Sequence, residues 1–246
     1  MRTANPALND KTFQNISTAT AADAMTINGT VNKTGIMLLL LIASAAYTWS
    51  QFIEGNVDSL SMWMIVGIIG GLVVAFVTVF KKTWAPVTAP LYAVFEGFAL
   101  GGISAILESS YPGIVIQAVA LTFGTAGCLL LAYKSGVIKA TENFKLGVFA
   151  ATGGIALIYF VGWIMSFFGS GIPYIHENGL IGIGFSLVVV VIAALNLVLD
   201  FDFIEKGAEH GAPKFMEWYA AFGLLVTLIW LYFEILRLLS KLNSRK

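Results

Sequence analysis

Carboxylate and amide side chains near the end of a long apolar run are the residues of this sequence best suited to chemistry. They are Asn196, Asp200, Asp202 and Glu205. At about 100° per helical residue, Asn196 and Asp200 share one face, whereas Asp202 points about 200° away and lies nearer Glu205. Carboxylate and amide oxygens are ligands of hard cations such as calcium. The spacing predicts an interior cation site at Asp200 and Asn196, and it favours a solvated helix end at Asp202 and Glu205.

Glu96 is a second carboxylate inside an apolar run. It lies about seven residues into the run, which is roughly 10 Å along a helix. Gly97, Gly101 and Gly102 follow it and would let another helix approach closely. Ionisable residues at this depth are costly and often functional. Two interpretations stay open for Glu96, a cation ligand or a protonated structural residue that hydrogen-bonds inside the bundle.

The last apolar run carries further polar positions. Glu217 opens the run, where the helix dipole favours an anion, so we expect a capping role. Thr227 lies about ten residues in, roughly 15 Å along a helix and near the middle of a membrane span. Glu234 and Arg237 are three residues apart, which predicts a structural ion pair.

The chain as a whole is too apolar for a soluble protein. Of its 246 residues, 58% are hydrophobic and 11% are charged, whereas about 25% are charged in ordinary soluble domains. The mean hydropathy is +0.84, the formal net charge is zero and there is a single cysteine. These values exclude a soluble enzyme and a secreted disulfide scaffold, and no net charge favours a nucleic acid partner. They predict an all-α integral membrane protein.

Seven apolar runs are long enough to cross a bilayer, whose core of about 30 Å needs about 20 helical residues. They are Gly35–Phe52, Met62–Phe80, Ala89–Leu107, Gly113–Tyr133, Leu146–Phe168, Leu180–Phe203 and Trp218–Leu239. Helices satisfy their backbone hydrogen bonds within each span, and the short connections indicate one seven-helix bundle. We therefore expect a polar, flexible cytoplasmic tail over residues 1–34, a membrane domain over 35–240 and a short basic tail over 241–246.

Lysine and arginine positions predict the orientation, because they concentrate in cytoplasmic connections. The tail and the second, fourth and sixth connections hold Arg2, Lys11, Lys33, Lys81, Lys82, Lys134, Lys139, Lys145, Lys206 and Lys214. The first, third and fifth connections hold acidic residues instead, so we expect a cytoplasmic N-terminus. Seven crossings then place Arg237, Lys241, Arg245 and Lys246 outside, against the rule, unless one span is re-entrant.

The sequence lacks the motifs of common enzymes. It has no H-E-x-x-H and no Walker A motif, and the last span has no lysine for a Schiff base. Serines lie near glycines in the spans, but no histidine lies there to act as their base. We expect no enzymatic activity and no cofactor.

Three features occur in an order typical of a known family. A Lys81-Lys82 turn follows the second span, an aspartate closes the sixth, and the final helix ends Leu236-Arg237-Leu238-Leu239. Over roughly residues 30 to 240, the chain resembles the transmembrane Bax inhibitor motif family, most closely its bacterial Bax inhibitor-1/YccA branch. The resemblance implies six helices around a central seventh, in a bacterial cytoplasmic (inner) membrane.

The resemblance also implies site residues. In that family, two buried aspartates on the sixth and seventh helices share a proton and are latched by a basic residue near the second helix. Asp200 matches the sixth-helix aspartate, and Lys81 or Lys82 matches the latch. The seventh-helix position holds Thr227, so a shared-proton pair needs another carboxylate. Glu96 is the candidate because its depth is similar.

Two functions remain open at this stage. The resemblance implies a pH-sensitive, calcium-permeable leak channel or cation/proton transporter in the lipid bilayer, with calcium as a permeant ion. The alternative is a regulatory membrane protein that modulates a membrane-bound protease or a secretion complex without transport. A channel moves ions alone, whereas a regulator needs its partner.

Overall fold

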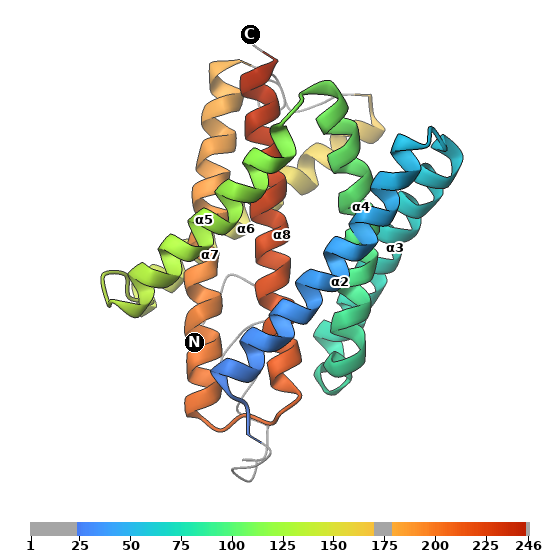
Figure 1. The fold of residues 1–246 in the computed structure, drawn as a ribbon. Coiled ribbons are helices and arrows are strands. Elements are labelled where there is room, and N and C mark those ends of the chain that lie inside the picture. Colours follow the sequence, from blue (N-terminus) through green and yellow to red (C-terminus); the bar gives the residue numbers. More distant parts are fainter. Residues whose placement is uncertain (1–23, 170–178, 245–246) are drawn as a thin grey trace. The chain divides into compact units, whose positions relative to one another are not determined.

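The computed structural model describes residues 24–169 and 179–244, and most of these residues are helical. The long helices, labelled in Figure 1, are α2 (Ile27–Ile53), α3 (Val57–Phe80), α4 (Ala85–Ser110), α5 (Ile114–Lys134), α6 (Glu142–Phe167), α7 (Leu180–Glu209) and α8 (Met216–Asn243). A short 3-10 helix, η1 (Lys82–Trp84), precedes α4. The β-structure within the described residues is one isolated bridge between Ala24 and Pro213.

All seven long helices of the described chain are long and apolar enough to cross a membrane. The shortest, α5, has 21 residues, which is about 32 Å of helix and matches the hydrocarbon core. Its length gives no reason to treat it as re-entrant. The predicted all-α, seven-helix membrane fold is confirmed. In α8, 56% of the most apolar segment is buried, the largest share among the seven helices.

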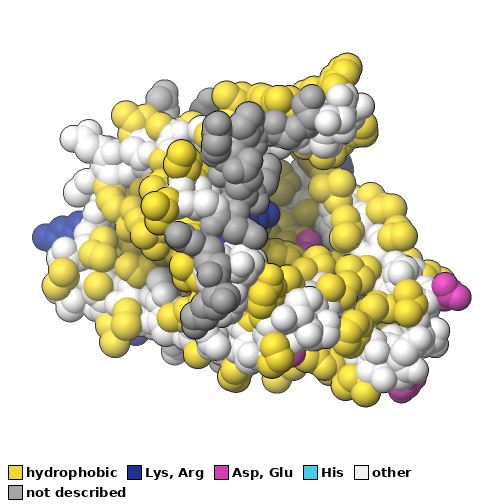
Figure 2. Space-filling view, turned by 90° about the horizontal axis from the view of Figure 1, so that it is seen from above, with side chains coloured by type: hydrophobic (Ala, Val, Ile, Leu, Met, Phe, Trp, Pro, Cys, Tyr) yellow, Lys and Arg dark blue, Asp and Glu magenta, His cyan; other side chains and the backbone are white. Residues whose placement is uncertain are grey.

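Large apolar side chains point outward along these helices. Figure 2 shows many hydrophobic side chains and few charged groups on one face. Leu39, Phe76, Leu131, Leu157 and Ile181 are all more than half exposed. Soluble monomers rarely expose so much contiguous apolar surface, whereas lipid solvates it.

The first helix begins earlier than the sequence predicts. α2 starts at Ile27, so residues 27–34 of the predicted tail are helical. Thr26 caps this helix, because its hydroxyl oxygen accepts the Gly29 N–H at 2.9 Å. Thr30 and Thr34 donate their hydroxyls to carbonyls one turn earlier, so these polar residues are accommodated inside the helix. The predicted flexibility of residues 1–23 lies outside the described residues.

The described chain forms two compact units, and α7 and α8 contribute to both. The α5–α6 unit contains the described residues of 113–202 and 227–244. The α2–α4 unit contains the described residues of 24–112 and 203–226. Each unit is described by itself below.

In the α2–α4 unit, α4 lies between α2 and α3 (Figure 1). Glycines make this close packing feasible. A Cβ atom at Gly97 would overlap the Leu41 carbonyl and the Ser44 hydroxyl of α2, and one at Gly101 would overlap the Ala45 carbonyl. Small residues spaced in this way let membrane helices approach backbone to backbone.

Gly97→Ala is expected to destabilise the protein, because the added methyl group meets a backbone carbonyl that cannot rotate away. Overpacking of this kind costs about 1–3 kcal/mol. The thermal unfolding temperature in detergent measures the effect. Gly153→Ala in α6 is the matched control, since a Cβ there meets nothing within 4 Å and alanine favours a helix by up to about 1 kcal/mol. Equal unfolding temperatures for the two variants would contradict the tight contact.

Candidate functional site

Asp200 and Asn196 lie buried one turn apart on α7 in the α5–α6 unit, with 1% and 2% of their surface exposed. The Asn196 amide nitrogen donates to Thr152 Oγ1 of α6 at 2.9 Å and to the Ile192 carbonyl at 2.8 Å. Both bonds use the nitrogen, so neither occupies the amide oxygen, which is the atom that a cation binds. The structure therefore places a carboxylate and an oriented amide on one buried face, as the spacing predicts.

Thr227 is buried on α8 in the same α5–α6 unit. Within residues 24–169 and 179–244, no three His, Cys, Asp or Glu side chains gather in a way that could hold a metal ion.

Asp202 is buried and paired, so the predicted solvated helix end is wrong at this position. Lys145 of α6, only 1% exposed, places its Nζ 3.0 Å from Asp202 Oδ2. The same Nζ lies 3.2 Å from Glu142 Oε1 at the start of α6. Glu205, by contrast, is exposed. The ion pair joins α6 to α7 two residues from Asp200.

The sequence reasoning missed Lys145 because it assigned this residue to a cytoplasmic connection. The helix begins at Glu142, four residues before the predicted span. Thr141 caps it by accepting the Phe144 N–H, at 3.3 Å. Threonine followed by an acidic residue is a signal of a helix start, and it could have placed Lys145 inside the helix.

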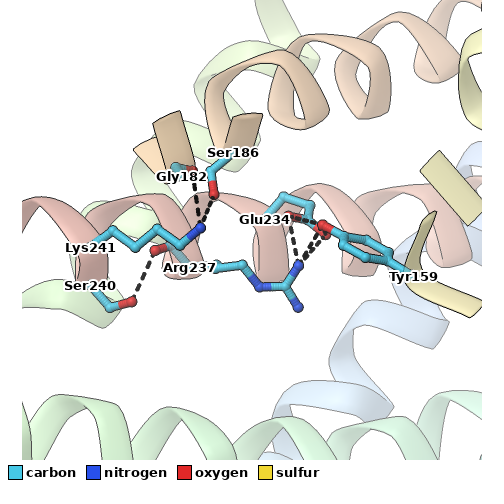
Figure 3. Close-up of polar contacts among 7 residues, drawn as sticks. All are labelled: Tyr159, Gly182, Ser186, Glu234, Arg237, Ser240 and Lys241. Atoms are coloured by element: carbon cyan, nitrogen blue, oxygen red, sulfur yellow. Dashed lines mark hydrogen bonds and ion pairs between the residues drawn. The ribbon is translucent and has the colours of Figure 1, made fainter. Parts of the chain in front are cut away.

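A second polar cluster of the α5–α6 unit joins α6, α7 and α8, as Figure 3 shows. The predicted pair of Glu234 and Arg237 is confirmed, with 3.0 Å between Arg237 Nη1 and Glu234 Oε1. Tyr159 of α6, which the sequence reasoning missed, donates its hydroxyl to Glu234 at 3.0 Å. Lys241 belongs to α8 and not to a basic tail. It is buried and donates to the Gly182 carbonyl at 3.0 Å and to Ser186 Oγ at 2.9 Å.

Glu217 anchors the α2–α4 unit and is fully buried. Its carboxylate accepts the backbone N–H and the hydroxyl of Thr26, at 2.9 and 2.8 Å. It also pairs with Lys33 of α2 and with Lys214, the latter at 2.8 Å. Glu217 lies in the first turn of α8, where the helix dipole favours an anion as predicted. The bonds to Thr26 show that it also holds the N-cap residue of α2.

The family model of Bax inhibitor 1-like proteins matches residues 5–244, which include all seven long helices. The chain belongs to the Bax inhibitor 1-like family. No curated protein and no solved structure matches it significantly. The resemblance seen in the sequence is confirmed for the Bax inhibitor family.

In this Bax inhibitor 1-like protein, the remaining predicted site residues lie in the α2–α4 unit. Glu96 is half-buried on α4, where it hydrogen-bonds Tyr92 one turn earlier. Lys81 is exposed, and Lys82 holds its ammonium 5.7 Å from the centre of the Tyr219 ring. Asp200 belongs to the other unit. The latch at Lys81 or Lys82 and the pairing of Glu96 with Asp200 therefore stay predictions.

Proposed function

We propose that this Bax inhibitor 1-like membrane protein is a calcium-permeable leak channel or cation/proton transporter whose ion path passes Asp200. The supporting observation is the buried pair of Asp200 and Asn196 on one face of α7. A carboxylate inside a membrane span is costly and commonly marks an ion or proton path. Oxygen donors of this kind suit a hard cation.

We also propose that protons compete with the cation at Asp200. The family's second aspartate is replaced by Thr227, which carries no charge. Protonation of Asp200 then removes the negative charge that attracts the cation, so calcium flux falls as the solution becomes more acidic.

The cellular setting is part of the proposal. We place the protein in a bacterial cytoplasmic membrane, with its N-terminus in the cytoplasm, and we assign it no enzymatic reaction and no cofactor. The basic residues of the sequence's tail and even-numbered connections support this orientation.

Calcium flux into liposomes that contain only the purified protein tests the proposal. We expect a flux well above that of empty liposomes, with a lower rate at mildly acidic than at mildly basic pH. A rate equal to that of empty liposomes at both pH values would overturn it. That result would favour the regulatory alternative, in which the protein modulates a membrane-bound protease or a secretion complex and needs its partner to act.

A further inference from the structure

Arg237 forms side-chain hydrogen bonds to Tyr159 and Glu234 through one guanidinium nitrogen, Nη1. Its Nη1 donates to the Tyr159 hydroxyl at 2.6 Å and to both carboxylate oxygens of Glu234, at 3.0 and 3.1 Å. Figure 3 shows one guanidinium nitrogen facing these two residues and another pointing away from them. The N–H groups of Nε and Nη2 thus make none of these bonds and can serve another acceptor.

The guanidinium is held in place and yet accessible. The Arg237 side chain is 41% exposed, whereas its partner Glu234 is buried. The guanidinium carbon also lies 5.1 Å from the centre of the Tyr159 ring. A planar cation that is oriented by a buried carboxylate and an aromatic face loses little side-chain freedom when it binds a ligand.

Arg237 lies near the end of a membrane-spanning helix. Six residues separate it from Asn243 at the end of α8, which is about 9 Å. Trp163 and Phe167 follow Tyr159 at helical spacing on α6, and both are exposed, with ring centroids 4.9 Å apart. Exposed tryptophan is enriched at membrane–water interfaces. These residues indicate that Arg237 lies at headgroup depth.

The guanidinium of Arg237 itself favours an anionic ligand. Two parallel N–H groups of a guanidinium match two oxygens of a phosphate in a bidentate arrangement. Leu242, five residues after Arg237 on α8, is an exposed apolar side chain that suits an acyl chain.

We propose that Arg237 binds the phosphate of an anionic phospholipid, with Glu234 and Tyr159 as positioning residues. The proposal does not depend on ion transport.

Binding of phosphatidylglycerol to the purified, delipidated full chain tests the proposal, with native mass spectrometry as the readout. We expect wild-type protein to bind phosphatidylglycerol more tightly than phosphatidylcholine. Arg237→Gln and Arg237→Lys are both expected to weaken phosphatidylglycerol binding about tenfold, because a lysine keeps the charge but lacks the bidentate geometry. Lys139→Gln, which removes an exposed cation elsewhere, is the matched control and is expected to bind like wild type.

Three results would overturn the proposal. One is unchanged phosphatidylglycerol binding in the Arg237 variants, and another is equal binding of phosphatidylcholine by wild type. The third is inorganic phosphate displacing the lipid at equal concentration, since the site would then serve free phosphate. Because Arg237→Gln leaves Glu234 buried without its cation, Glu234→Gln/Arg237→Gln is the folding control. This double variant is expected to fold and still to lose phosphatidylglycerol binding.

Discussion

Asp200→Asn is expected to lower calcium flux into liposomes by about tenfold or more. The substitution keeps the shape of the side chain and removes its charge. A hydrogen bond to a charged group contributes about 1.5–3 kcal/mol. Each 1.4 kcal/mol is about tenfold in an equilibrium constant. The pH dependence of the remaining flux is expected to disappear as well, because an amide does not titrate. Initial rates at mildly acidic and mildly basic pH measure both effects.

Asp58→Asn is the matched control, since Asp58 is an exposed aspartate in the first turn of α3. It is expected to leave the flux and its pH dependence unchanged. Thermal unfolding of both variants separates a lost ion path from a misfolded protein. Wild-type flux in a folded Asp200→Asn variant would place the ion path away from α7.

The sequence was sufficient to predict the seven helices because each span must bury its own backbone polar groups in lipid. That requirement leaves long apolar runs that are visible without a structure. The helix ends were less predictable. α2 and α6 both begin before their predicted spans, since Thr26 and Thr141 cap them through side-chain bonds that hydropathy does not register.

The site was predictable where it depends on a single helix. Asn196 and Asp200 share a face because of helical geometry alone, and the structure buries both. Lys145 and Tyr159 were not predictable in the same way. Each meets a partner more than 50 residues away in sequence, at Asp202 and Glu234, and helical periodicity carries no information about which helices are neighbours.

Lys145→Met is expected to be strongly destabilising. Lys145 is almost fully buried, and its ammonium lies 3.0 Å from Asp202, whose side chain is only 9% exposed. Removing one partner of a buried ion pair costs about 3–5 kcal/mol. The thermal unfolding transition in detergent measures the loss. Lys139→Met, at an exposed position in the connection before α6, is the matched control and is expected to change stability by less than about 0.5 kcal/mol.

Two further variants distinguish how much the ion pairs of Lys145 with Glu142 and with Asp202 contribute to stability. Its other partner, Glu142, is 74% exposed, so Glu142→Gln is expected to cost at most about 1 kcal/mol. Lys145→Met/Asp202→Leu removes both buried charges together and is expected to recover most of the lost stability, because an apolar pair replaces a desolvated ion pair at little cost. If the double variant is as unstable as Lys145→Met alone, an uncompensated charge on Asp202 is not the cause of the loss.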